Sequence, residues 1–307
     1  MRKNYFINKI VRVCIKRSHI FFIQLYALII NRWTSSGNIN CNFNGVHFRM
    51  FNQCDDHLVD YFYYNKPYHE ENDLKLFVNL SKSSSCIVDI GANSGLYSIL
   101  GSYANPKAKI YSIEPYSINV KRLKKNIELN KCGNIYVEQI GIGDRKGSIM
   151  LNVPENNSFT DVSSMDIEFS KKVYPNTKWK TENINIDTLD NFRTTHQLKV
   201  DLIKCDVEGF EMKVFEGMNN LLNADRPVVI FECFLDEERK TFFNAVLKKY
   251  NYFVYLILAE GLIYLDNGFE DNVDGLNYLI TPVLPLKNFL SYSEIENDSQ
   301  KILNNKI

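Results

Sequence analysis

The chain has 307 residues, of which 45% are hydrophobic, enough for one large domain or for one domain with an extension. Its 36 basic and 36 acidic residues balance, but eight Lys or Arg and no Asp or Glu precede Asp55, which leaves 28 basic (36 − 8) against 36 acidic residues in the remainder. Because phosphate binding needs a basic face, this acidic body argues against a nucleic-acid partner, and none is expected.

The N-terminal segment is basic and contains an apolar run of eleven residues, Ile20 to Ile30. A membrane-spanning helix needs about 20 residues, so this run is too short to be one. Three interpretations stay open: a signal peptide, a basic amphipathic helix on anionic lipid or on a membrane-bound partner, and a helical extension packed on the body or in a dimer. Peripheral contact with the inner face of the membrane is therefore one expectation.

Residues 38–51 alternate around Asn44-Gly45, a pair that is typical of a β-hairpin turn. Residues 56–80 are predicted to be helical and are rich in aromatic side chains. We expect this aromatic group to cover one mouth of a ligand pocket, with one member lining the substrate site. The group consists of Tyr61, Phe62, Tyr63, Tyr64 and Tyr68.

The seven cysteines are scattered and contain no C-x-x-C pair. Such a set is typical of free thiols in a reducing compartment, so a cytoplasmic location is expected. Cys86, Cys205 and Cys233 fall in or beside predicted buried strands and are expected to be core residues.

A strand, a tight turn and a helix are predicted over 86–104. The turn contains Gly91, Ala92 and Gly95, which are small enough to let a ligand approach the backbone, and glycine tolerates positive φ. A second strand over 108–113 ends at Glu114, where a carboxylate can accept both hydroxyls of a ribose. The pattern predicts an adenosine-containing cofactor; an ordinary strand–helix turn with an unrelated acid behind it is the alternative.

The glycine spacing bears on which cofactor binds. A dinucleotide fingerprint reads G-x-G-x-x-G, whereas Asn93 stands at the third position here. Asp89, at the end of the strand, would repel a pyrophosphate but suits the ammonium group of S-adenosylmethionine. We therefore expect S-adenosyl-L-methionine, with a nicotinamide-dependent oxidoreductase as the alternative.

Strands and helices continue to alternate after this turn, which predicts a parallel sheet with right-handed crossovers. Asn152 to Lys180 is polar and is the expected substrate loop or lid. The other predicted elements are a helix from Ser117 with Ser117 as its N-cap, strands 134–140, 201–205, 228–232, 252–258 and 277–281, and helices 210–222 and 236–249.

Several short motifs occur in a fixed order: VDIGANSG from Val88, IEP from Ile113, GDRKG from Gly143, DTLD from Asp187, LIKCDVEG from Leu202 and RPVVIFE from Arg226. This series resembles the FkbM family of S-adenosylmethionine-dependent methyltransferases over roughly residues 85–232. The resemblance implies an α/β, Rossmann-like class I methyltransferase fold, with a mostly parallel seven-stranded sheet flanked by helices and a late antiparallel pair. We expect a helical and hairpin extension over 1–80, the methyltransferase domain over 81–290 and a polar tail over 291–307 that frays.

Candidate site residues follow from this reading. Ligands in open α/β sheets lie beyond the carboxyl ends of the strands, where Asp206, Glu208 and Glu232 are expected to converge. Asp206 is expected to face the acceptor and the methionine end of the cofactor, with Glu208 as helper or general base. The alternative for Glu208 is a structural role at the start of the next helix. The cofactor residues are expected to be Asp89, Gly91, Ala92, Asn93, Gly95, Glu114, Pro115 and Asp144.

Three further residues have open interpretations. Lys204 either pairs with one of the site acids or forms a salt bridge at the sheet edge, and Ser163 and Ser164 either touch a ligand or are plain loop. The strand-end acids could hold Mg²⁺, but the resemblance does not demand a metal and none is expected.

The predicted activity is O-methylation of a hydroxyl on a glycan, a glycolipid or a secondary metabolite, with a small-molecule or glycan acceptor as partner. A non-catalytic binding protein on a methyltransferase fold is the second alternative.

Overall fold

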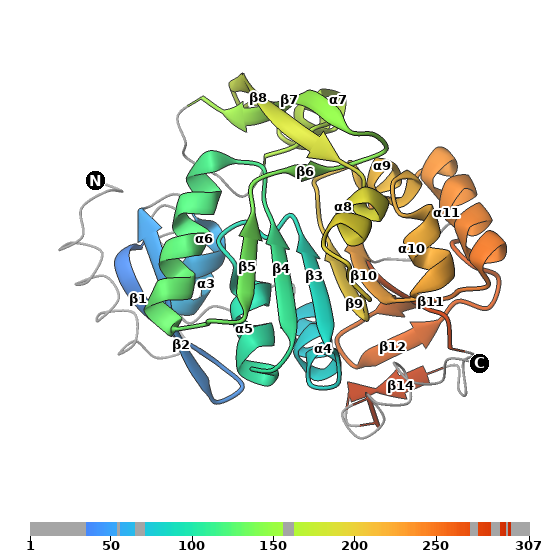
Figure 1. The fold of residues 1–307 in the computed structure, drawn as a ribbon, viewed down its shortest axis with the longest axis horizontal. Coiled ribbons are helices and arrows are strands. Elements are labelled where there is room, and N and C mark those ends of the chain that lie inside the picture. The colour runs from blue at the N-terminus through green and yellow to red at the C-terminus, as the bar shows by residue number, and fades with distance from the viewer. Residues whose placement is uncertain are drawn as a thin grey trace, which may run out of the picture.

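The computed structural model describes residues 35–53, 56–64, 71–155, 163–270, 276–283, 289–292 and 294–295, and its centre is a nine-stranded sheet (Figure 1). Five neighbouring strands run parallel, and four antiparallel strands extend one side of them. The order across the sheet is β5 (Ile135–Glu138), β4 (Lys109–Ile113), β3 (Cys86–Ile90), β9 (Leu202–Cys205), β10 (Val228–Glu232), β13 (Asn277–Thr281), β11 (Phe253–Ile257), β12 (Gly261–Tyr264) and β14 (Phe289–Ser291).

The predicted Rossmann-like class I architecture is confirmed, and the sheet is larger than expected. The first seven strands in this order are the seven that were predicted, with β13 and β11 as the late antiparallel pair. The additional strands β12 and β14 pair antiparallel at the β11 edge. Both are short, with four and three residues, so they have too little alternation to be recognised as strands.

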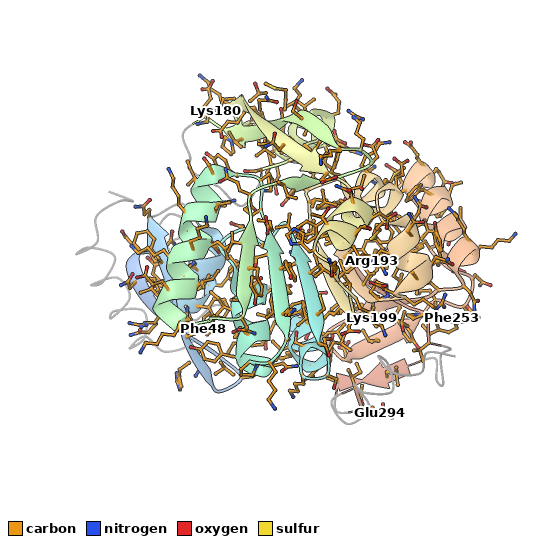
Figure 2. The ribbon with its side chains drawn as sticks, viewed as in Figure 1. Phe48, Lys180, Arg193, Lys199, Phe253 and Glu294 are labelled. Atoms are coloured by element: carbon orange, nitrogen blue, oxygen red, sulfur yellow. The ribbon has the colours of Figure 1, made fainter. Side chains whose placement is uncertain are left out.

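Helices cover both faces of this sheet, because successive side chains of a strand point to opposite faces. On β3, Ile87 packs with α4 (Glu71–Ser81) and α5 (Leu96–Ala104). Its neighbour Val88 belongs to a second apolar cluster with α8 (Leu189–Thr195), α9 (Glu211–Glu216), α10 (Asn219–Ala224) and α11 (Glu237–Tyr250). Side chains fill the space between the sheet and the helices (Figure 2).

The predicted N-terminal hairpin is present as β1 (Ser36–Phe43) and β2 (Val46–Gln53), with Asn44 and Gly45 at positive φ in the turn. It packs against α3 (His57–Tyr64) and α6 (Ser117–Asn130) on the side of the β5 edge (Figure 1). The apolar run from Ile20 to Ile30 and Tyr68 lie outside the described residues.

A second, three-stranded sheet stands beyond the carboxyl ends of β3, β4 and β5 (Figure 1). It consists of β6 (Gly141–Ile142), β8 (Trp179–Asp187) and β7 (Gly147–Pro154), and α7 (Ile167–Val173) lies between β7 and β8 in the chain. The prediction of one polar loop over 152–180 was therefore wrong for its described part. Within the described part of this segment the one complete element is α7, whose seven residues are too few for a helical period to be recognised.

Several local expectations are corrected. Ser117 is the first residue of α6 rather than its N-cap, which is Tyr116. The predicted helix 210–222 is divided into α9 and α10 at Gly217. The tail does not fray from its start, because the Tyr292 hydroxyl donates to the Leu258 carbonyl at 2.7 Å and Ile295 is fully buried.

The five described cysteines are buried free thiols, as predicted for Cys86, Cys205 and Cys233. Among the helices of the described ranges, none is long and apolar enough to cross a membrane.

Candidate active site

A cavity of about 320 Å³ opens where the parallel strands end, within the roughly 300–1,000 Å³ that is typical of ligand pockets. Its walls come from the turn after β3, the ends of β4, β9 and β10, the β5–β6 connection, α3 and the β7–α7 segment. Seven predicted site residues line it: Gly91, Ala92, Asn93, Glu114, Pro115, Asp206 and Glu208. Of the described residues predicted for the site, Asp89, Gly95 and Asp144 do not.

The turn after β3 is fixed across the sheet, because the backbone N–H groups of Gly91 and Ala92 both donate to the Ile113 carbonyl at 3.0 and 3.1 Å. Packing inside the protein leaves no space for a side chain at its two glycines. A Cβ at Gly91 would lie 1.8 Å from the Asp206 carbonyl oxygen, and one at Gly95 would lie 2.3 Å from Leu123 Cδ1. Both residues also have positive φ, which glycine adopts without steric cost. Packing inside the protein therefore requires both glycines, and of the two Gly91 also lines the cavity.

Glu114 is a buried carboxylate at the cavity wall, as expected for an acid that ends β4. Its Oε2 accepts the Asn93 N–H and its Oε1 accepts the Tyr116 N–H, both at 2.9 Å. Burial raises the pKa of Glu114 to about 7, against these hydrogen bonds, which favour the charged form. The Asn119 side-chain amide also donates to Oε1 at 3.5 Å. Each oxygen has two lone pairs, so Oε2, with one donor, keeps the capacity to accept a hydroxyl.

Asp89 lies beneath the turn and is fully buried. Its Oδ2 accepts the Ser98 hydroxyl at 2.6 Å, whereas its Oδ1 has no hydrogen-bond partner among the described residues. Burial raises the pKa of Asp89, and the nearby Lys204 ammonium opposes that shift. The structure thus places Asp89 behind the cavity wall rather than at its surface.

Asp206 faces the cavity beside a buried lysine. Lys204 Nζ donates to Asp206 Oδ2 at 2.8 Å and lies 4.8 Å from the centre of the Tyr97 ring, and all three residues line the cavity. The first interpretation of Lys204, pairing with a site acid, is confirmed.

The loop after Asp206 carries Glu208 with a φ of 54°. Its carbonyl accepts the Ser164 hydroxyl at 2.6 Å, which ties the loop to the segment before α7. Glu211 accepts the N–H groups of Val207 and Gly209 at 3.2 Å each, and burial raises the pKa of Glu211 to about 7. The structural role at the helix start, considered for Glu208, is therefore filled by Glu211.

Asp144 lies away from these acids. Its carboxylate pairs with Lys213 at 3.5 Å and with Arg145 at 3.4 Å. The expectation that Asp144 is a cofactor residue thus has no support from its position.

The remaining wall is aromatic and acidic. Tyr61 is the one member of the predicted aromatic group that lines the cavity within the described residues, while Phe62 packs on Phe48 with ring centres 5.5 Å apart. Glu232 and Ser163 line it as well. Sequence reasoning missed Tyr97, Tyr174 and Phe234, because nothing local distinguishes a cavity aromatic from a core aromatic.

Two features fit this cavity to a cationic nucleoside. Its ionisable lining comprises four carboxylates, Glu114, Asp206, Glu208 and Glu232, against the single ammonium of Lys204 among the described residues. In addition, Asn93 Oδ1 and Ser94 Oγ at the turn are buried without a hydrogen-bond partner in the described part of the chain. Because buried polar atoms are normally hydrogen-bonded, these two oxygens are available to a bound molecule.

Comparison with known proteins decides the family. The model of the methyltransferase FkbM domain matches residues 89–257, more than half of the chain. The chain belongs to the FkbM methyltransferase family. The matched region runs from the end of β3 to the end of β11. It therefore includes the turn after β3, Glu114 and the loop after β9.

Curated relatives of this FkbM-family chain are distant. It is 25% identical over 147 residues to Methyltransferase 1 of Beauveria bassiana and 24% identical over 161 residues to the hexuronic acid methyltransferase AglP of Haloferax volcanii. These matches cover 44% and 52% of this chain and 59% and 61% of the relatives, so the chain spans about three fifths of their length. Among solved structures, a methyltransferase FkbM from Methylobacillus flagellatus is similar with a TM-score of 0.42 and 15% identity, over 73% of this chain and 52% of that one.

Proposed function

We propose that this protein is an S-adenosylmethionine-dependent O-methyltransferase that acts on a hydroxyl group of a glycan, a glycolipid or a secondary metabolite. One observation carries the proposal: the FkbM-family cavity presents an excess of carboxylates at the ends of β4, β9 and β10. Such a lining attracts a sulfonium and an ammonium group and repels the pyrophosphate of a nicotinamide dinucleotide.

In this proposal the turn and Glu114 hold the nucleoside. Glu114 accepts a ribose hydroxyl at Oε2, which the Asn93 N–H leaves with an unused lone pair. Asn93 and Ser94 supply the two buried oxygens that lack partners among the described residues. The bound cofactor supplies an already activated methyl group, so the protein has mainly to position the acceptor and remove its proton.

The two acids after β9 act on the acceptor. Asp206, held by Lys204, orients the hydroxyl, and Glu208 takes its proton as general base. The name of the Haloferax volcanii relative, a hexuronic acid methyltransferase, supports a sugar acceptor. We also propose a cytoplasmic location and peripheral contact of the basic N-terminus with the inner membrane face. Both rest on the sequence alone.

Calorimetric titration of the full chain with S-adenosylmethionine and, separately, with NAD tests the cofactor. We expect binding of S-adenosylmethionine, weakened in Glu114→Ala by about 1–3 kcal/mol through loss of charged hydrogen bonds. Tight NAD binding without a response to S-adenosylmethionine would overturn the proposal. Transfer of a labelled methyl group to hexosides, followed by mass spectrometric location of the label, then tests whether oxygen is the methylated atom.

A further inference from the structure

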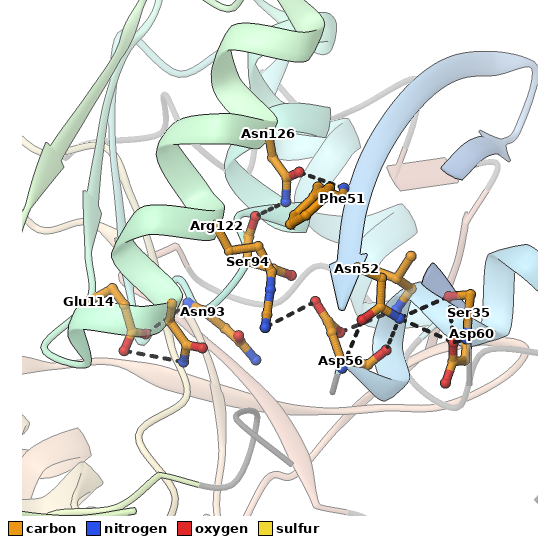
Figure 3. A network of polar contacts seen from close by, with 12 residues as sticks. Ser35, Phe51, Asn52, Asp56, Asp60, Asn93, Ser94, Glu114, Arg122 and Asn126 are labelled. Carbon is orange, nitrogen blue, oxygen red and sulfur yellow. Dashed lines mark hydrogen bonds and ion pairs between the residues drawn. The ribbon is translucent and has the colours of Figure 1, made fainter. Parts of the chain in front are cut away.

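One face of α6 is polar and yet turned toward the protein. Asn119, Arg122, Asn126 and Asn130 are spaced by three, four and four residues, which places them on one side of the helix. The first three are 2%, 4% and 0% exposed, respectively. A polar helix face normally meets water, so the burial of this one needs partners. Those partners are the N-terminal extension on one side and, on the other, the turn after β3 (residues 91–95), here called the cofactor turn (Figure 3).

Asn126 bonds to both partners with one side chain. Its Oδ1 accepts the backbone N–H of Phe51 on β2 at 2.7 Å, and its Nδ2 donates to the Ser94 carbonyl at 2.8 Å (Figure 3). Ser94 lines the cavity directly after Asn93, whose N–H binds Glu114. A single buried amide therefore joins the hairpin to the turn that holds the proposed cofactor.

Asn130, one helical turn later, also binds the hairpin. Its Oδ1 accepts the Arg49 N–H at 2.8 Å, and its Nδ2 donates to the Arg49 carbonyl at 2.7 Å. In addition, its Nδ2 donates to the Asn126 carbonyl at 2.7 Å and its Oδ1 accepts the Tyr103 hydroxyl on α5 at 3.4 Å. The spacing of the contacts with β2 fits, because two residues of a strand and four of a helix both advance about 6–7 Å. Asn126 and Asn130 thus each accept a backbone N–H of β2, and of the two, within the described residues, only Asn126 also bonds to the turn.

The hairpin has a second anchor on the same helix face. Arg122 Nη1 lies 3.8 Å from Asp56 Oδ2, and both side chains are buried. Asn52 on β2 donates to the Asp56 carbonyl at 2.9 Å, and its own Oδ1 accepts the Asp56 N–H at 3.1 Å. The extension is therefore held along α6, and loss of one amide contact need not release it.

We propose that Asn126 is a positioning residue that couples the N-terminal hairpin to the cofactor turn, so that the hairpin sets the turn's geometry without contacting the ligand. This inference rests on the proposed function for one point, the identity of the ligand as S-adenosylmethionine. Coupling between two sites is reciprocal, so a ligand bound at the turn also stabilises the hairpin.

Hydrogen exchange of the full chain, with and without S-adenosylmethionine, tests the coupling in Asn126→Leu and in its matched control Asn130→Leu. In the ligand-free protein, Asn126→Leu is expected to speed exchange in both residues 46–53 and residues 91–97. Asn130→Leu is expected to speed exchange in residues 46–53 alone. In the wild type the ligand slows exchange in both segments, and in Asn126→Leu its protection of the hairpin is lost.

Cofactor affinity gives a second readout. We expect Asn126→Leu to weaken S-adenosylmethionine binding at least about fivefold, the lower end of typical coupling, and Asn130→Leu to leave it within about twofold. Should Asn126→Leu fail to fold, Asn126→Asp keeps the acceptor for Phe51 and lacks the donor to Ser94, so it is expected to loosen the turn alone. Equal turn exchange in the Asn126 and Asn130 variants would overturn the inference. If the wild type binds no S-adenosylmethionine, the proposed function fails, while the ligand-free exchange data still test the coupling.

Discussion

Gly91 and Asp206 meet backbone to backbone: a Cβ on Gly91 would lie 1.8 Å from the carbonyl oxygen of Asp206. The Asp206 N–H in turn donates to the Ile90 carbonyl at 3.1 Å. The turn after β3 and the loop after β9 are therefore one packed unit, and the position of the acid depends on the absence of a side chain at Gly91.

Gly91→Ala is expected to destabilise the fold by two additive effects. Its φ of +75° costs a non-glycine residue about 1–2 kcal/mol, and forcing a methyl group against the Asp206 backbone costs roughly 1–3 kcal/mol more. The control is Gly45→Ala, with a similar φ of +83° but nothing within 4 Å of its Cβ, which should show the first effect alone. Urea unfolding of both variants measures the difference, and equal losses would contradict the packing argument.

Cofactor affinity is expected to rise with pH through neutrality. Glu114 has a pKa raised to about 7 by burial, and its ionised form is the stronger acceptor for a ribose hydroxyl. Affinity for S-adenosylmethionine should therefore increase by up to about tenfold per pH unit below pH 7 and level off above it. Glu114→Gln should bind weakly with no such dependence. Titrations between pH 5.5 and 8.5 check this (roughly one and a half units either side of that pKa), and an unchanged slope in the variant would point to another group.

Folded stability is expected to fall as pH rises from about 4.5 to 7, in part through Glu211. Its pKa lies near 7 in the folded protein against 4.5 as its ordinary value, so between these pH values the folded state binds more protons than the unfolded state. Each such proton lowers the free energy of unfolding by at most about 1.4 kcal/mol per pH unit. Glu211→Gln should flatten this slope in chemical denaturation, and a steeper slope would refute the assignment.

Substitution of either acid after β9, Asp206 or Glu208, is expected to lower turnover more than it lowers cofactor affinity. Asp206→Asn and Glu208→Gln should each keep S-adenosylmethionine affinity within a few-fold. Loss of a general base lowers turnover by about 10²–10⁴-fold, the effect we expect for Glu208→Gln. Glu237→Gln, at an exposed acid on α11, is the control that should leave turnover unchanged. If turnover in Glu208→Gln matches the control, the base is a different residue.

A stability prediction concerns Asp225, which does not line the cavity. This buried carboxylate accepts Arg193 Nε and the Val200 N–H, both at 2.8 Å. Asp225→Asn should cost about 2–3 kcal/mol, since hydrogen bonds to a charged group are lost in a buried place. Asp236→Asn, at the exposed N-cap of α11, should cost well under about 1 kcal/mol because asparagine caps equally well. Thermal unfolding of the pair checks the ranking.

The elements around the cofactor turn could be predicted because their signals are local. A β-branched run, a small-residue turn and an apolar helix start are contiguous over β3 and α5, and parallel strands bring their carboxyl ends to one edge of the sheet. That rule alone placed Glu114, Asp206, Glu208 and Glu232 at one cavity.

The remaining features depend on partners distant in sequence. The function of Gly95 is set by Leu123 on α6, and the buried polar face of that helix is set by a strand about 80 residues earlier, as in the contact of Asn126 with Phe51. Periodicity finds the apolar residues of α6, and a polar helix face is normally expected to meet water. Periodicity does not indicate that the Asn126 and Asn130 side chains accept backbone N–H groups of β2, as a neighbouring strand would.

The wall of the cavity is shared between the parallel strands and two segments that add no strand to the central sheet. Leu58 and Tyr61 come from α3, and Ser163, Met165 and Tyr174 come from the stretch that joins β7 to β8. Under the proposed function, selection on the acceptor can therefore act on these appended parts while the strand ends proposed to hold the nucleoside stay fixed. A new preference can arise in such a chain by exchanging a short insert, with no need to redesign the folding core.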